Sequence, residues 1–323
     1  MTDNPAVKPL DSGQQAGLSQ WLAAQPPNLI GDGLSIEAFH RRLPDLIEDR
    51  CVLAMRDDRQ HIGAIALDPF KRRVSACYLD AERATAATPT ALFKAVEARA
   101  LAYGLRNLHC CVRPDALALM QQIGFSTDSE QPETRRGLAV SKDLTNDAAA
   151  WQREVFATLD ALGIDEGYGP RHRLDMVQDC QQLVSIGLDA YDREQKMAAD
   201  AADAWHNMQE SASRNGIKLQ VVSAFRSLSY QTGILRAKLD KGQPLEQILA
   251  VSAAPGFSEH HSGRALDLKS PGEPPLEESF AQTDAYRWLS AKAHFFGFRE
   301  SFGRANRHGL VWEPWHWCYH PHG

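Results

Sequence analysis

The chain has 323 residues, which is long for one domain and makes two domains the natural expectation. Hydrophobic residues make up 43% of the chain and charged residues 24%, a composition that can form a packed core. The formal net charge of −6 gives no electrostatic attraction to nucleic acid or to an anionic membrane, so neither is expected as a partner. No stretch approaches the length of a membrane-spanning helix.

The start of the chain and its cysteines bear on the cellular compartment. Residues 1–5 include no basic segment followed by an apolar run, so we expect no signal peptide, with a previously trimmed leader left open. The six cysteines form neither a CxxC pair nor the framework of a small disulfide-rich domain. We therefore expect reduced thiols in a cytoplasmic protein.

Residues 1–145 alternate between strand and helix patterns, which is typical of an α/β domain. Apolar runs predict strands at residues 50–56, 61–67, 74–79, 108–112 and 138–140. Thr88 as N-cap, followed by Pro89, predicts the start of a helix that ends before Gly104. A shorter helix is predicted at residues 115–122.

The pattern becomes helical in residues 150–323, after a polar segment at 141–150 that we interpret as the linker. Helices are predicted at residues 151–162, at one or two places within 174–215, and at 228–239, 245–251 and 283–296. Strands are predicted at residues 217–223, 265–268, 311–312 and 315–319.

Two separated segments of this half carry the side chains of a catalytic metal site. His260 and Asp267 lie seven residues apart, Gly263 allows a tight backbone between them, and His316 follows much later. Two imidazoles and one carboxylate suit a zinc ion that keeps its fourth position open for water. Glu313, three residues before His316, is left over and is the candidate general base.

Each motif alone has an ordinary structural explanation. A His–Asp pair at this spacing usually lies on the solvated surface, and a buried histidine beside tryptophan is usually part of a core. The motifs occur together here, and a third element precedes them. Arg226, predicted to follow a strand and open a helix, offers a planar donor fork for a carboxylate or a developing oxyanion.

These elements, in this order, resemble the VanY-type zinc D-alanyl-D-alanine carboxypeptidases of the LAS group of peptidases. The resemblance covers roughly residues 170–320. It is carried by three motifs, which are S-x-H-x-x-G-x-A-x-D at residues 258–267, E-P-W-H at 313–316, and S-A-F-R-S at 223–227 with Gln231 after it. The family has Gly-Tyr where this chain has Ala224 and Phe225. The resemblance implies an α+β fold with a small antiparallel sheet and flanking helices.

The resemblance also implies a role for each matching residue. His260, Asp267 and His316 would bind one zinc ion per chain, and Glu313 would act as base and later as proton donor. Arg226 would hold the substrate and the tetrahedral oxyanion.

Ser258 and Gln231 would contact the terminal carboxylate of the substrate. The implied activity is hydrolysis of the terminal peptide bond of cell-wall stem peptides. D,D-carboxypeptidase, L,D-carboxypeptidase and dipeptidase action stay open, because loops such as residues 270–282 shape the pocket. A module that binds muropeptides without cutting them is the alternative from another functional class, and it would not require Glu313.

Other polar residues lie close to these motifs. The spacing of seven to Asp267 selects His260 as ligand, so we expect His261 on the surface. Cys318 shares the predicted strand face of His316, where a structural role is expected and a redox or inhibitory role is the alternative. His320 and His322 are expected in a frayed tail.

Residues 30–145 resemble a GCN5-related acetyltransferase, on the helix that ends at Gly104, the strand after it, and the second helix that ends at Gly124. That family binds the pyrophosphate of acetyl-CoA on backbone N–H groups at the start of the first helix, through a glycine-rich segment. Residues 83–88 contain no glycine, and Met120 replaces the tyrosine acid of the family. We therefore expect a degenerate domain with a structural or substrate-binding role, with a bifunctional peptidase and acetyltransferase as the alternative.

Overall fold

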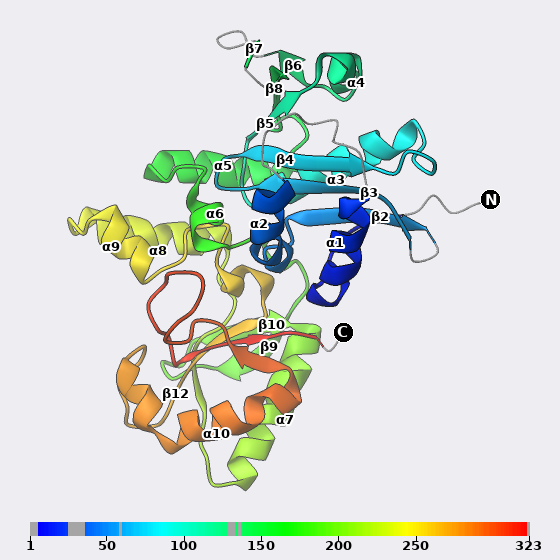
Figure 1. Ribbon diagram of the computed structural model, residues 1–323. Helices are drawn as coiled ribbons and strands as arrows, with labels where there is room; N and C mark the ends of the chain where they lie inside the picture. Colours follow the sequence, from blue (N-terminus) through cyan, green and yellow to red (C-terminus); the bar gives the residue numbers. More distant parts are fainter. Residues whose placement is uncertain (1–5, 25–35, 58–59, 128–132, 135–136, 322–323) are drawn as a thin grey trace. The chain divides into compact units, whose positions relative to one another are not determined.

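The computed structural model describes residues 6–24, 36–57, 60–127, 133–134 and 137–321 (Figure 1). The chain divides into two compact units, Met1–Ala149 and Ala150–Gly323. The expectations for residues 1–5 and for His322 lie outside the described residues. Among the helices of the described part, none is both long and apolar enough to cross a membrane.

The first unit is built on one mixed sheet. Its described strands are β1 (Val7–Pro9), β2 (Val52–Asp57), β3 (Gln60–Asp68), β4 (Arg73–Leu79), β5 (Asn107–Val112), β6 (Ser126–Thr127), β7 (Glu133–Thr134) and β8 (Gly137–Asp143). Along the sheet the order is β1-β2-β3-β4-β5-β8-β6, with β7 also paired to β8. The pair β4–β5 is parallel and the other pairs are antiparallel. Its described helices are α1 (Gln15–Ala23), α2 (Ile36–Glu48), α3 (Ala87–Ala102) and α4 (Leu117–Gln122).

Helix α3 packs closely on strand β3, which explains a glycine in the middle of that strand. Residues 61–68 of β3 are all buried, and Leu92 of α3 is fully buried. A Cβ atom at Gly63 would lie 2.8 Å from Leu92 Cδ1 and 3.2 Å from the Tyr78 carbonyl oxygen. The absence of a side chain at Gly63 therefore allows the close approach of helix and strand.

Two predicted boundaries in this unit were wrong. Helix α3 begins at Ala87 with Ala86 as N-cap, and Thr88 lies inside its first turn, where its hydroxyl accepts a hydrogen bond from the N–H of Thr85 just before the helix. The predicted linker at residues 141–150 begins as strand, because β8 continues to Asp143, which pairs with Asn107.

The second unit combines a small antiparallel sheet with helices, which confirms the predicted α+β class. Its helices are α5 (Ala150–Leu162), α6 (Tyr168–His172), α7 (Ala199–Arg214), α8 (Leu228–Asp240), α9 (Leu245–Ala250) and α10 (Asp284–Lys292). Its strands are β9 (Leu183–Leu188), β10 (Glu194–Ala198), β11 (Gln220–Ser223), β12 (Ala265–Lys269), β13 (Phe298–Glu300) and β14 (His316–Tyr319). Strands β9 and β10 form a separate hairpin, and the sheet order is β11-β12-β14-β13.

Within residues 174–215, where one or two helices were predicted, the structure has this hairpin followed by one helix, α7. The Asp189 carboxylate accepts the backbone N–H groups of Tyr191 and Arg193, and Asp192 adopts a positive φ of 61°. These local bonds close a turn where the polar, Ala-rich composition favoured a helix. The strand predicted at residues 311–312 is also absent, because the Val311 N–H donates to the Ala250 carbonyl instead of to a neighbouring strand.

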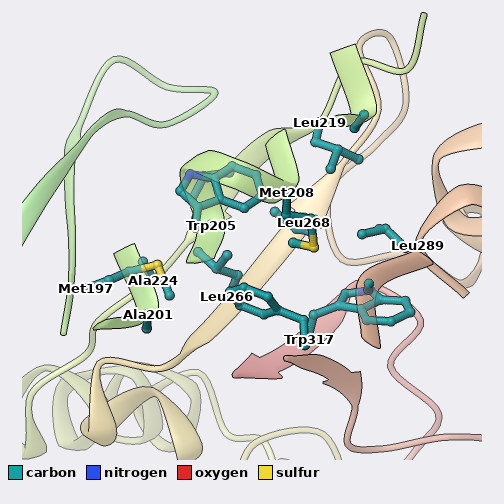
Figure 2. Packing of buried hydrophobic residues seen from close by; sticks show 14 of the residues in the cluster. Met197, Ala201, Trp205, Met208, Leu219, Ala224, Leu266, Leu268, Leu289 and Trp317 are labelled. Carbon is teal, nitrogen blue, oxygen red and sulfur yellow. The ribbon is translucent and has the colours of Figure 1, made fainter. Parts of the chain in front are cut away.

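The core of the second unit lies between α7 and one face of β12 (Figure 2). Leu266 and Leu268 point toward Trp205 and Met208 of α7, and all four side chains are fully buried. Burying one such apolar side chain stabilises the fold by about 1.5–3 kcal/mol. Because side chains alternate along a strand, this packing directs Asp267 to the opposite face of β12.

Candidate metal centre

Strand pairing places the second and third candidate ligands opposite each other. In the antiparallel pair β12–β14, Asp267 is the partner of His316, and Leu266 is the partner of Trp317. Trp317 belongs to the apolar core, so the packing that buries Leu266 and Trp317 turns Asp267 and His316 together to the other face. Asp267 also pairs with Ser223 at the end of β11, the strand that leads to Arg226.

His260 enters from a short 3-10 helix, Glu259–Ser262, which ends at Gly263 in a left-handed conformation with φ of 69°. A Cβ atom at Gly263 would lie 2.9 Å from the Ala198 backbone nitrogen, so this sharp exit requires glycine. The Nδ1–H group of His260 donates to the Ala224 carbonyl at 2.5 Å. This bond leaves Nε2 as the unprotonated ring nitrogen that faces Asp267.

The atoms of His260, Asp267 and His316 that meet here fit a metal ion. His260 Nε2 is buried without a hydrogen-bond partner and lies 3.3 Å from Asp267 Oδ1. His316 Nδ1 lies 3.2 Å from the same oxygen. Two ligands of a tetrahedral zinc ion, each about 2.0 Å from the metal, are about 3.3 Å apart. The lone pair of His260 Nε2 faces the Asp267 carboxylate across such a distance, so a cation bound between them could be coordinated by both.

The ionisation of these groups follows from their burial and from each other. Burial and the charge of Arg226 lower the pKa of His260 to about 4, so its imidazole is neutral. Burial alone would lower the pKa of His316, but its bonds to Asp267 and Glu259 raise it to about 10. Burial would raise the pKa of Asp267, but the adjacent histidines and Arg226 hold it well below its usual range. The His316 proton thus supplies positive charge where a metal would supply it.

Glu313 lies beside this group of three ligands but does not belong to it. Its Oε2 atom is 4.0 Å from His316 Nδ1. Burial raises the pKa of Glu313 to about 7, although the charge on His316 opposes the shift. A carboxylate with a pKa near neutrality can both take up and release a proton, as general acid–base catalysis requires.

The three ligands and Glu313 line one pocket of about 390 Å³, together with the three residues predicted to contact substrate, Arg226, Gln231 and Ser258. The Arg226 guanidinium lies 3.7 Å from Asp267 Oδ2, measured from its Nη2 atom. Gln231 donates from Nε2 to the Ala253 carbonyl, while its Oε1 atom is buried without a partner. The volume is that of a site for a small molecule or a peptide end.

Glu259 is a residue of this site that sequence reasoning missed. Its Oε2 atom accepts hydrogen bonds from His316 Nε2 at 2.7 Å and from the Ser301 hydroxyl at 2.6 Å. The first bond keeps the proton of His316 on Nε2 and turns Nδ1 toward Asp267. The two residues are 57 positions apart, so no local spacing rule links them.

His261 is buried, and the prediction that it lies on the surface was wrong. Its Nδ1–H group donates to the Arg226 carbonyl at 2.6 Å, and its Nε2 atom accepts the Gly256 N–H at 3.0 Å. The ring is therefore a neutral core histidine that ties the backbone of Arg226 to the segment that carries His260. His320, expected in a frayed tail, is exposed, but its backbone N–H donates to the Gly297 carbonyl.

Residues 194–322 match the family model described as VanY, D-alanyl-D-alanine carboxypeptidase. The C-terminal half of the chain carries a VanY domain. This match confirms the resemblance drawn from the three motifs.

Individual relatives agree with this match. The YodJ protein of Bacillus subtilis (strain 168), named as a carboxypeptidase, is 32% identical over 125 residues, which are 37% of this chain and 45% of the relative. The chain spans less than half the length of the curated relatives it matches. The solved structure of the LD-carboxypeptidase LdcB is 25% identical and covers 45% of this chain and 74% of its own, with a TM-score of 0.41.

For the N-terminal half, the similar solved structures include a GCN5-related N-acetyltransferase from Rhodopseudomonas palustris. It is 19% identical and covers 45% of this chain and 98% of its own, with a TM-score of 0.32.

Replacing Glu259 by glutamine tests its role beside His316. The variant Glu259→Gln keeps the shape of the side chain but removes its charge, so His316 loses a charge-assisted hydrogen bond. We expect zinc affinity to fall by about 10- to 100-fold, measured by competition with a chelating indicator. The control is Glu246→Gln, at an exposed glutamate of α9, which should leave the affinity unchanged. Equal zinc affinity of wild type and Glu259→Gln would show that the bond does not orient the ligand.

Proposed function

We propose that the C-terminal half is a zinc-dependent carboxypeptidase that removes the terminal residue of cell-wall stem peptides. The observation that carries this proposal is the buried, unpartnered Nε2 atom of His260, which faces Asp267 and His316 beside Glu313. One zinc ion per chain would be held by His260, Asp267 and His316. The VanY match and the relatives named as carboxypeptidases support this assignment.

The donor set of two imidazoles and one carboxylate suits zinc, which, when bound, makes a water molecule acidic enough to lose a proton near pH 7. In our proposal the Glu313 carboxylate takes that proton and later gives it to the leaving amine. The second transfer restores the carboxylate, so Glu313 is unchanged after each cycle. A site that only binds peptides would need no such group, which favours catalysis over the alternative of a muropeptide-binding module.

Arg226, Gln231 and Ser258 would hold the peptide. The Arg226 Nε atom is buried without a hydrogen-bond partner, and its guanidinium lines the pocket, so it has donors free for a carboxylate or an oxyanion. The buried Ser258 lines the same pocket, and its hydroxyl could donate to the substrate carboxylate. The unpartnered Gln231 Oε1 is an acceptor and would take an N–H group of the peptide, whereas a contact of Gln231 with the terminal carboxylate would require its Nε2 to leave the Ala253 carbonyl.

Incubation of the zinc-loaded protein with tripeptide, tetrapeptide and pentapeptide stems tests the proposal and its specificity. Release of D-alanine from the pentapeptide would indicate D,D-carboxypeptidase action. Release of D-alanine from the tetrapeptide would indicate L,D-carboxypeptidase action, and release of an intact dipeptide would indicate dipeptidase action. Chelation should abolish release, and added zinc should restore it. Peptide binding without any released fragment would instead support the binding module, and activity that survives chelation would exclude a zinc enzyme.

Glu313→Gln should retain zinc and lower kcat by about 10²-fold or more, because the amide cannot accept the proton. In the wild type, kcat/KM should fall as the pH drops and Glu313 becomes protonated. The midpoint should lie between the usual pKa of 4.5 and about 7, because a bound cation stabilises the carboxylate. Glu246→Gln is the control. Zinc loss with unchanged turnover per bound zinc would make Glu313 a ligand and not a base.

Arg226→Lys keeps the positive charge but loses the planar fork. We expect kcat/KM to fall at least about tenfold, or about 1.4 kcal/mol, with zinc content unchanged. A loss confined to KM would assign the guanidinium to the substrate carboxylate, and a loss in kcat would assign it to the oxyanion. Arg236→Lys, at an exposed arginine of α8, should match the wild type. Full activity of Arg226→Lys would make this arginine an ordinary surface residue.

We propose that the N-terminal unit has lost acetyl-CoA binding and keeps a structural or substrate-binding role. Several N–H groups that precede α3 are already engaged, since those of Glu82 and Arg83 donate to the Asp80 carboxylate and that of Thr85 donates to Thr88. With no glycine in residues 83–88, a pyrophosphate would meet side chains and fewer free donors at the start of this helix.

Calorimetry of the full chain should detect no acetyl-CoA binding at high micromolar ligand. An active acetyltransferase measured in the same way is the positive control. Tight binding would overturn the degenerate assignment and restore the bifunctional alternative.

A further inference from the structure

A second group of potential metal ligands adjoins the first. One oxygen of Glu259, the Cys318 sulfur and one ring nitrogen of His320 lie within 4.8 Å of one another. Cys318 and His320 are two residues apart at the end of β14, so their side chains share the strand face of His316. The group thus extends the row of potential ligands along β14. Glu259 belongs to this group and also contacts His316 of the first site.

The chemistry of this group suits a thiophilic divalent cation. Thiolate, imidazole and carboxylate are all zinc ligands, and a thiolate particularly favours soft metals such as cadmium. Cys318 is buried, whereas His320 is exposed, so a cation could enter from the side of His320. The hydrogen bonds that the Glu259 carboxylate accepts from the His316 ring and from the Ser301 hydroxyl both go to Oε2.

We propose that Glu259, Cys318 and His320 form a second, weaker metal site whose occupation disturbs the first. On binding, a bond forms between the Cys318 sulfur and the cation, and the thiol proton leaves to the solvent. The site is weaker because one ligand is exposed and another, Glu259, already accepts two hydrogen bonds. A positive charge on Glu259 weakens the hydrogen bond that it accepts from His316, so excess zinc inhibits the enzyme. This inhibitory consequence rests on the proposed carboxypeptidase function, whereas the binding site itself does not.

Cadmium is the probe for the site itself, because a cadmium–thiolate bond absorbs in the ultraviolet and the first site contains no sulfur. The reduced full-length protein is loaded with one equivalent of zinc and titrated with Cd²⁺. We expect a thiolate absorption band that Cys318→Ser removes and that His320→Ala shifts to at least about tenfold higher cadmium. Cys180→Ser is the matched control, because this half-buried thiol belongs to neither group of ligands among the described residues, and it should keep the band. No band in the wild type, or an equal band in Cys318→Ser, would overturn the proposal.

Stem-peptide hydrolysis against free zinc tests the consequence. The wild type and Cys180→Ser should lose activity as zinc rises beyond one equivalent, and Cys318→Ser should need at least about tenfold more zinc for the same loss. Cys318 takes no part in the proposed reaction, so its serine variant should match the wild type at one equivalent. Inhibition of wild type and Cys318→Ser at the same zinc concentration would overturn the inhibitory role. If no variant hydrolyses any stem, the proposed function fails, and the cadmium titration still decides the site.

Discussion

The pairing of β12 with β14 is the constraint on which the rest of the second unit depends. It sets Leu266 against Trp317 on the core face and Asp267 against His316 on the other. A slip of one residue would bury the carboxylate among apolar side chains and expose the leucine, so the apolar core specifies the register. The hydrophobic energy of the core thereby determines the geometry of the metal ligands on the opposite face of the strand pair.

That polar site is electrostatically incomplete without a cation. His260 is neutral and Asp267 is charged, and both are buried, an arrangement that is costly unless positive charge lies between them. In the structure the proton on His316 and the Arg226 guanidinium provide it, with Glu259 on the far side of the His316 ring. A metal ion would replace that proton and leave Glu259 as the partner of the remaining ring N–H. Glu259 thereby connects the first group of ligands to Cys318, so the two sites are not electrostatically independent.

The adjacent histidines perform two different tasks because their rings bond to different carbonyls of one segment. His260 donates to Ala224, and His261 donates to Arg226. The Arg226 N–H returns a hydrogen bond to the His260 carbonyl, so the two segments are tied in both directions. The backbone that carries the candidate substrate-binding arginine is thus held to the backbone that carries a candidate ligand. Preorganisation of this kind lowers the cost of ordering the site when a substrate binds.

The sequence alone was enough to indicate two units, the α+β class of the second and seven of the residues that line its pocket. Such information is local, because His260, Gly263 and Asp267 lie within one turn and one strand, and histidine and aspartate are residue types that bind metals. It did not predict the hairpin at residues 183–198, which the side chain of Asp189 closes in a segment whose composition favours a helix.

Only the tertiary structure revealed the contact between Glu259 and His316, the burial of His261, and the approach of Cys318 and His320 to Glu259. Each of these contacts joins residues from different elements, and its existence depends on strand register and core packing. The identities of neighbouring residues along the chain do not contain that information.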